Sequence, residues 1–325
     1  MAPRRPQNAN GASPSTHQAA IDQKTHRLAI TMDESSYVDI DPGSDPRKLY
    51  QIFRELSLER TIDPEIMQRH LIDSTYRLVH GSNNIESGNY SQNITIELCR
   101  AIFEGLINDP SDLLVLSVDS YKEIAQHIKA AQYLFVQMMK SDLSEDIIKE
   151  THRILTNELN RNDGTPETIN SGRYRQAAYW TTSLEYMDEK KVAPSMKGMI
   201  VRYKVDVLKA KRKGQIDPIS LAAKYSHIFF SIRPFLSGNG QMSRLILNAI
   251  LFKWAGCLAT FGQDVKDCNQ YLLMVTGTID KEFVQDHGEW KDLSDDKRPK
   301  LYNQLASFTL KHAVDNLMQV YEPQV

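Results

Sequence analysis

The chain has 325 residues with 41% hydrophobic content, which is enough to bury a large core in one or two domains. Its net charge of −2 gives no field of one sign over the whole chain, so neither nucleic acid nor an acidic membrane surface is expected as a partner. The longest apolar run, around residues 245–255, is shorter than the about 20 residues that a bilayer span needs. These features predict a soluble protein.

The cysteines show neither paired spacing nor a C-x-x-C motif: Cys99, Cys257 and Cys268. This usage is typical of a reducing compartment, so we expect an intracellular protein, cytoplasmic or nuclear. Residues 1–26 are rich in Pro, Asn, Ser, Gln and Ala and lack the apolar segment of a secretory signal. Residues 1–40 are therefore predicted to form a disordered tail.

Two Asp-Pro pairs open the first predicted helices. Asp45-Pro46 precedes apolar residues at helical spacing, and Asp63-Pro64 repeats the arrangement before a helix that runs toward His80. Residues 41–140 should form an N-terminal helical region, with further helices expected over residues 94–106, 111–140 and 144–159.

The pattern changes between Gly172 and Pro194, where strand-forming side chains occur without a helical period. We expect a small β-hairpin here, the only one in the chain. Its aromatic side chains either support an edge that binds an extended peptide or pack the hairpin onto the helices: Tyr179, Trp180 and Tyr186.

Helices resume at residues 195–211, and Asp217-Pro218 then supplies an N-cap and a first-turn proline for a helix that ends near Ile232. The next helix, residues 242–255, carries apolar residues on nearly every face, which is typical of a buried central helix. The sequence therefore predicts a mostly α fold, completed by helices over residues 267–278 and 298–318.

A glycine-rich turn, Gly238-Asn239-Gly240, stands directly before this central helix. Glycines let backbone N–H groups converge on a ligand, and the helix N-terminus adds roughly half a positive charge, so phosphate or carboxylate can bind there. Arg244, about one turn inside the helix, can point back to the same place with a fork that suits phosphate oxygens. Taken alone, the pattern also fits a tight turn that only caps the helix.

The surrounding segment, SIRPFLSGNGQMSR over residues 231–244, resembles the signature of the Fic family, H-P-F-x-[D/E]-G-N-G-R-x-x-R. The resemblance runs from about residue 63 to residue 255. It implies a Fic-type helical bundle with a small β-hairpin flap, with the Fic core and the C-terminal helices in residues 141–325. Three positions depart from the signature: the histidine is Arg233, the acidic residue is Ser237 and the first arginine is Gln241.

The resemblance implies a reaction in which the histidine deprotonates a target hydroxyl, the acidic residue holds Mg²⁺, and two arginines hold the phosphates while AMP passes from ATP to a protein. Arg233 cannot accept the proton, because a guanidinium stays charged and offers only donors. Ser237 offers a neutral hydroxyl, a poor sole ligand for Mg²⁺, so no metal ligand is predicted. His227 lies roughly 9 Å before Arg233 along its helix, too far away to replace the base.

We therefore expect a pocket that favours anions, with ATP or another nucleotide as the ligand. The residues expected to hold it are Gly238, Asn239, Gly240, Gln241 and Arg244.

Two shorter segments also resemble the family. Ser82 to Ser87, SNNIES, resembles the inhibitory motif [S/T]-x-x-x-E-[G/N], which implies that Glu86 pairs with Arg244 and obstructs a terminal phosphate. As a short motif it also fits a solvated glutamate after a helix. Gly172-Arg173-Tyr174-Arg175 resembles the G-x-[Y/F]-R element that opens the flap.

Three functions fit these residues. The first is a Fic-fold protein that binds a nucleotide or another phosphorylated ligand but is impaired in AMP transfer. The second is a repurposed enzyme in which Arg233 stabilises developing negative charge, with a small molecule as substrate. The third is residual protein AMP transfer. A protein target docked on the flap or a small anionic ligand is the expected partner.

Overall fold

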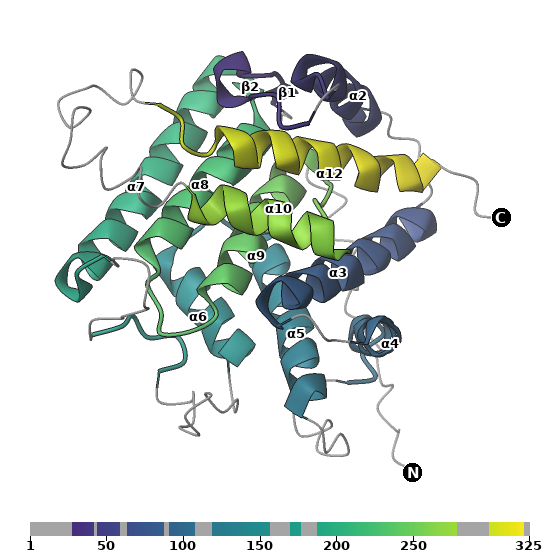
Figure 1. Cartoon of the computed structure of the whole chain (residues 1–325), viewed down its shortest axis with the longest axis vertical. Helices are drawn as coiled ribbons and strands as arrows, with labels where there is room; N and C mark the ends of the chain where they lie inside the picture. Colours follow the sequence, from purple (N-terminus) through teal and green to yellow (C-terminus); the bar gives the residue numbers. More distant parts are fainter. Residues whose placement is uncertain are drawn as a thin grey trace, which may run out of the picture.

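The computed structural model describes residues 28–41, 44–58, 64–87, 91–107, 119–156, 170–176, 187–277 and 299–321. The predicted mostly α fold is confirmed (Figure 1). Its elements are β1 (Ala29–Ile30), η1 (Glu34–Ser36), α2 (Pro46–Leu58), α3 (Pro64–Ser87), α4 (Gln92–Phe103), α5 (Asp119–Lys140), α6 (Glu145–Thr156), α7 (Glu189–Lys213), β2 (Gln215–Ile216), α8 (Pro218–Ile232), α9 (Asn239–Ala255), α10 (Val265–Thr276) and α12 (Asn303–Tyr321). Among these helices, none is both long and apolar enough for a bilayer span.

Proline and its preceding cap start several helices where the sequence predicts them. Pro46 and Pro64 are the first residues of α2 and α3. The Asp217 carboxylate accepts a hydrogen bond from the Ser220 N–H at 3.0 Å and so caps α8. A fixed φ suits the first turn of a helix, where the missing N–H costs no hydrogen bond.

Helix α9 lies at the centre of the molecule and packs against α8, α5 and α3 (Figure 1). Nearly all of its side chains from Met242 to Leu251 are buried, as the predicted all-round apolar pattern requires. The loop 233–238 connects α8 to α9, so the glycine-rich turn lies at the end of two helices that the core holds rigidly. This placement fixes the candidate site.

The N-terminal segment differs from its prediction as a disordered tail, because residues 28–41 pack onto the helical core. Strand β1 pairs in parallel with β2, and the Tyr37 hydroxyl donates to Asp217 Oδ1 at 2.8 Å. Tyr37 is buried. A two-residue strand and a single 3-10 turn have no periodicity, so this segment can be recognised only from its long-range contacts.

The predicted hairpin also needs a correction at its C-terminal end. Helix α7 already begins at Glu189, where Asp188 accepts a hydrogen bond from Lys190 N–H at 2.8 Å, and Pro194 lies inside it. Asp188-Glu189 is a helix start that the aromatic pattern obscured. Residues 177–186, which carry most of the predicted flap, lie outside the described residues, and the one described strand pair is the parallel pair β1–β2.

Candidate functional site

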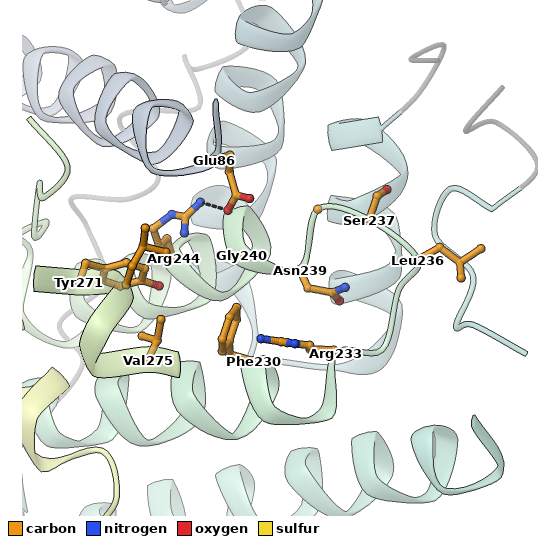
Figure 2. A pocket seen from close by; sticks show the side chains of 12 residues that line it. Glu86, Phe230, Arg233, Leu236, Ser237, Asn239, Gly240, Arg244, Tyr271 and Val275 are labelled. Carbon is orange, nitrogen blue, oxygen red and sulfur yellow. Dashed lines mark hydrogen bonds and ion pairs between the residues drawn. The ribbon is translucent and has the colours of Figure 1, made fainter. Parts of the chain in front are cut away.

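A pocket of about 230 Å³ opens at the N-terminus of α9 (Figure 2). The turn Gly238-Asn239-Gly240 forms one wall. Phe230 and Arg233 come from the end of α8, Tyr271 and Val275 from α10, and Glu86 from the end of α3. Three consecutive helices, α8, α9 and α10, and the distant helix α3 therefore meet around the turn that the sequence predicts as an anion site.

The loop before α9 is held in shape by the side chain of Asn239. Asn239 Oδ1 accepts a hydrogen bond from the Phe235 N–H at 3.0 Å, and Asn239 Nδ2 donates to the Phe235 carbonyl at 2.8 Å. Gly238 has φ +67°, a left-handed conformation that favours glycine. The first N–H groups of α9 are consequently directed at the pocket, as an anion site at a helix N-terminus requires.

Arg233, at the position of the family's histidine, lines this pocket. It is the only described non-glycine residue with a positive φ, 45°, which ends α8 in a left-handed turn. Its guanidinium lies 4.5 Å from the centre of the Phe230 ring, a cation–π contact that holds the charge over the pocket (Figure 2). The group adds a permanent positive charge and hydrogen-bond donors there, and it has no site for a proton.

Arg244 and Glu86 form the ion pair that the resemblance implies. Arg244 is 1% exposed, and its Nη2 donates to Glu86 Oε1 at 2.6 Å while its Nε donates to Ser82 Oγ at 2.7 Å (Figure 2). Burial is the largest single influence on the pKa of Arg244 and lowers it, but the charges of Glu86 and Tyr271 and the hydrogen bonds to them together outweigh burial, so the pKa is raised. Arg244 is therefore charged, and Glu86 lies between its guanidinium and the open pocket.

Glycine at position 240 is what leaves room for this carboxylate. A Cβ built on Gly240 would lie 2.1 Å from Glu86 Oε1. Glu86 thus lies directly against the first turn of α9, where a bound phosphate would also lie.

Gln241, which the sequence predicts as an anion-binding residue, is not among the described residues that line the pocket. Its Nε2 donates to Asn83 Oδ1 at 3.1 Å, and His127 Nδ1 lies 2.7 Å from the same oxygen. Burial, with a further contribution from the charge of Arg244, lowers the pKa of His127 to about 3, so this imidazole is neutral. Gln241 therefore ties α9 to α3 in the described conformation.

His152 on α6 is a residue of the site that the sequence analysis missed. Its Nε2 donates to the Ser237 carbonyl at 3.2 Å, its Nδ1 accepts from the Gly172 N–H at 2.9 Å, and its ring stacks on Phe235 at 3.7 Å. Burial lowers its pKa to about 4, which agrees with a neutral ring that donates on one side and accepts on the other. A single histidine on an amphipathic helix gives no sequence signal for this role.

The flap root, residues 170–176, is joined to the same loop by Arg175. The Arg175 N–H donates to the Pro234 carbonyl at 2.8 Å, and its Nε donates to the Arg233 carbonyl at 2.9 Å. Tyr174 lies beside Phe235, and its hydroxyl donates to Glu145 Oε2 at 3.0 Å. The loop 233–238 is therefore held by the predicted flap residues, directly by Tyr174 and Arg175 and through His152 by Gly172.

The donor set does not fit a magnesium ion. Ser237 supplies a neutral hydroxyl at the family's metal position, and Glu86, the one carboxylate among the described residues that line the pocket, already binds Arg244. Within the described part of the chain, no three His, Cys, Asp or Glu side chains cluster as metal ligands do. His227 is 5% exposed and does not line the pocket, so it offers no substitute base.

Comparison with known proteins places these features in context. A model described as the Fic/DOC family matches residues 142–251. The chain is 28% identical over 211 residues to a protein adenylyltransferase Fic of Nematostella vectensis, covering 63% of this chain and 44% of the relative. It is 28% identical over 86 residues to a Fido domain-containing protein of Dictyostelium discoideum, covering 26% of this chain and 57% of the relative. The chain thus spans less than two thirds of each of these curated relatives.

Two solved structures share the fold. A Fic domain-containing signaling protein from Bacteroides thetaiotaomicron aligns with TM-score 0.61 and 16% identity over 86% of this chain and 99% of the other. Fic-1 from C. elegans aligns with TM-score 0.59 and 20% identity over 85% of this chain and 70% of the other. At these identities the likeness concerns the fold alone.

Proposed function

This chain belongs to the Fic/Fido family, and we propose that its loop pocket binds a nucleotide or another phosphorylated ligand while transfer of AMP to a protein is impaired. The observation that carries the proposal is the place of Arg233. A guanidinium lines the pocket where the family has its base, next to the N-terminus of α9.

Anion binding is supported by the charges that converge on the pocket. The N–H groups of the first turn of α9 and the guanidinium of Arg233 can each approach a phosphate oxygen. Arg244 adds a third positive group, although Glu86 covers it. Because Glu86 lines the pocket and is paired with Arg244, a ligand with a terminal phosphate competes with it for Arg244.

Impaired transfer follows from what Arg233 and Ser237 lack. A positioned general base contributes typically 10²–10⁴-fold to a rate, and an arginine cannot replace it. The missing carboxylate ligand at position 237 removes charge stabilisation at the phosphates in addition.

The experiment has two arms. Calorimetry should detect binding of AMP and ATP that Arg233→Gln weakens by about tenfold, the range for a hydrogen bond to a charged group, while Arg54→Gln on the exposed face of α2 has no effect. Labelling with radioactive ATP and Mg²⁺ should give no transfer near that of a relative with the full signature. Robust labelling that Gly238→Val abolishes would overturn the impairment, and unchanged affinity in Arg233→Gln would overturn the site.

A second function, altered chemistry, is favoured by the same position of Arg233. A fixed guanidinium can stabilise negative charge that develops on a substrate during reaction. A mass-spectrometric screen against phosphorylated metabolites tests it: turnover that depends on Arg233 supports this function, and binding without turnover supports the first. Residual AMP transfer predicts labelling that survives in Arg233→Gln.

A further inference from the structure

Helix α7 carries a concentration of positive charge that the net charge of the chain conceals. Its 25 residues include nine Lys or Arg and two acids, a net charge of +7 in a chain whose total is −2. The helix lies at the edge of the molecule (Figure 1).

The outward face of α7 combines this charge with apolar side chains. The inward face buries residues such as Met196, Tyr203 and Val207. On the opposite face Val201 is 54% exposed, Val205 43% and Leu208 47%, at the i, i+4, i+7 spacing of one helical stripe.

Cations border this stripe along its length. Lys197 stands four residues before Val201, Lys204 four residues before Leu208, and Arg212 four residues after Leu208, so all three share its face. Each of these three cations is exposed.

Little negative charge balances these cations. Within the described residues, the cations of α7 form ion pairs only between Lys209 and Asp206 at 4.0 Å and between Lys211 and Asp142 at 3.9 Å. Asp206 is bound more closely by Lys224, at 2.7 Å. Among the residues that the structure describes, the positive field of the outward face is consequently almost unopposed.

We propose that this face of α7 docks on an anionic phospholipid surface. An apolar stripe with Lys and Arg on the same helix face is typical of helices that lie in a membrane interface, where aliphatic groups enter the acyl boundary and cations reach the headgroups. An outer helix of 25 residues, about 37 Å long, offers a long, narrow contact surface that can lie along a membrane plane.

The apolar stripe also argues against nucleic acid. A phosphate backbone would be recognised by the cations alone, and Val201, Val205 and Leu208 would face charged phosphates without gaining burial. The inference concerns a different surface from the pocket, so it stands or fails independently of the proposed function. It also revises the expectation, drawn from the net charge, that no acidic membrane surface is a partner.

Co-sedimentation of the full chain with vesicles tests the proposal. Wild type should bind phosphatidylcholine vesicles containing about 30% phosphatidylserine and should not bind pure phosphatidylcholine, because the anionic lipid supplies the attraction. Raising the salt from about 50 to about 300 mM should weaken binding.

Three variants separate the contributions. Lys197→Glu with Lys204→Glu should reduce binding by roughly tenfold or more, whereas the matched reversal Lys48→Glu with Arg54→Glu on α2 should not. Val201→Ser, Val205→Ser and Leu208→Ser together should also weaken binding while leaving every charge in place. Circular dichroism and Tm establish that each variant is folded.

Two outcomes overturn the proposal. One is equal binding to both vesicle types, or no binding to either. The other is salt-dependent binding to duplex DNA or RNA that is as tight as the binding to anionic vesicles and is unaffected by the triple serine variant, which would assign the face to nucleic acid.

Discussion

Glu86 Oε1 lies 2.6 Å from Arg244 Nη2. The same oxygen would lie only 2.1 Å from a Cβ added to Gly240. The carboxylate therefore occupies both the outward side of the buried arginine and the surface of the first turn of α9. One side chain from α3 covers two groups that could hold a phosphate.

Replacing Glu86 by Gly should expose Arg244 and remove a repelling negative charge. We expect ATP to bind about 1–3 kcal/mol more tightly, roughly ten- to a hundredfold, with a smaller gain for AMP, because the terminal phosphate gains most. Calorimetry with both nucleotides measures this, and Glu86→Gln, which keeps the size but not the charge, should give an intermediate gain. Equal changes for ATP and AMP would show that Glu86 does not gate a terminal phosphate.

Restoring the signature should restore chemistry if the rest of the pocket is intact. Arg233→His, Ser237→Asp and Gln241→Arg together supply the base, the carboxylate and the second guanidinium, whereas Arg233→His alone lacks two of the three. Auto-modification with labelled ATP is the measurement. Gln241→Arg removes the hydrogen bond from Gln241 to Asn83. A folded triple variant that binds ATP but transfers no AMP would therefore indicate that the pocket needs this hydrogen bond for transfer.

His152 should make stability depend on pH. Its pKa is about 4 in the folded protein, against about 6.5 for an unperturbed histidine, so the unfolded state binds more protons between these values. The stabilisation is present above pH 6.5 and is lost as the pH falls toward 4. At pH 5 the loss should reach about 2 kcal/mol.

Urea unfolding of wild type and His152→Gln at pH 7 and pH 5 tests this. The stability difference between the two proteins should shrink at pH 5, because glutamine does not titrate. Comparing the two proteins also cancels the opposite effect of Asp217, whose burial raises its pKa to about 6. A difference that is the same at both pH values would mean that His152 is not held neutral.

Two helical glycines should respond oppositely to alanine. A Cβ on Gly81 of α3 would lie 2.1 Å from the Phe261 carbonyl oxygen, a backbone atom that cannot move aside cheaply. We expect Gly81→Ala to cost about 1–3 kcal/mol of unfolding free energy.

Gly198 of α7 is the matched control, since a Cβ added there would have no neighbouring atom within 4 Å. Gly198→Ala should stabilise the protein by about 0.5–1 kcal/mol through helix propensity. Thermal unfolding of both variants decides, and destabilisation of similar size at both positions would contradict the close contact between α3 and the loop at Phe261.

Features that depend on residues close together in the chain could be predicted from the sequence. Prolines 46, 64 and 218 mark helix starts because the first turn tolerates a missing N–H, and the all-round apolar pattern of residues 242–255 identifies a buried helix. The segment of residues 231–244 was sufficient to predict the family and the three departures from its signature. These signals lie within a few residues of one another, and local sterics and hydrogen bonding produce them.

Apart from the Glu86–Arg244 pair, which the family resemblance implied, only the tertiary structure decided which of the predicted residues meet. Gln241 points to Asn83 because α3 crosses beside it, and His152 joins the loop because α6 places its ring between Gly172 and Ser237. Residues 28–41 are held by long-range contacts, among them the pairing of β1 with β2 and the hydrogen bond from the Tyr37 hydroxyl to Asp217, 180 residues later. Such contacts join residues that are far apart in the chain, and their partners are set by the packing of whole helices, which local periodicity and capping do not specify.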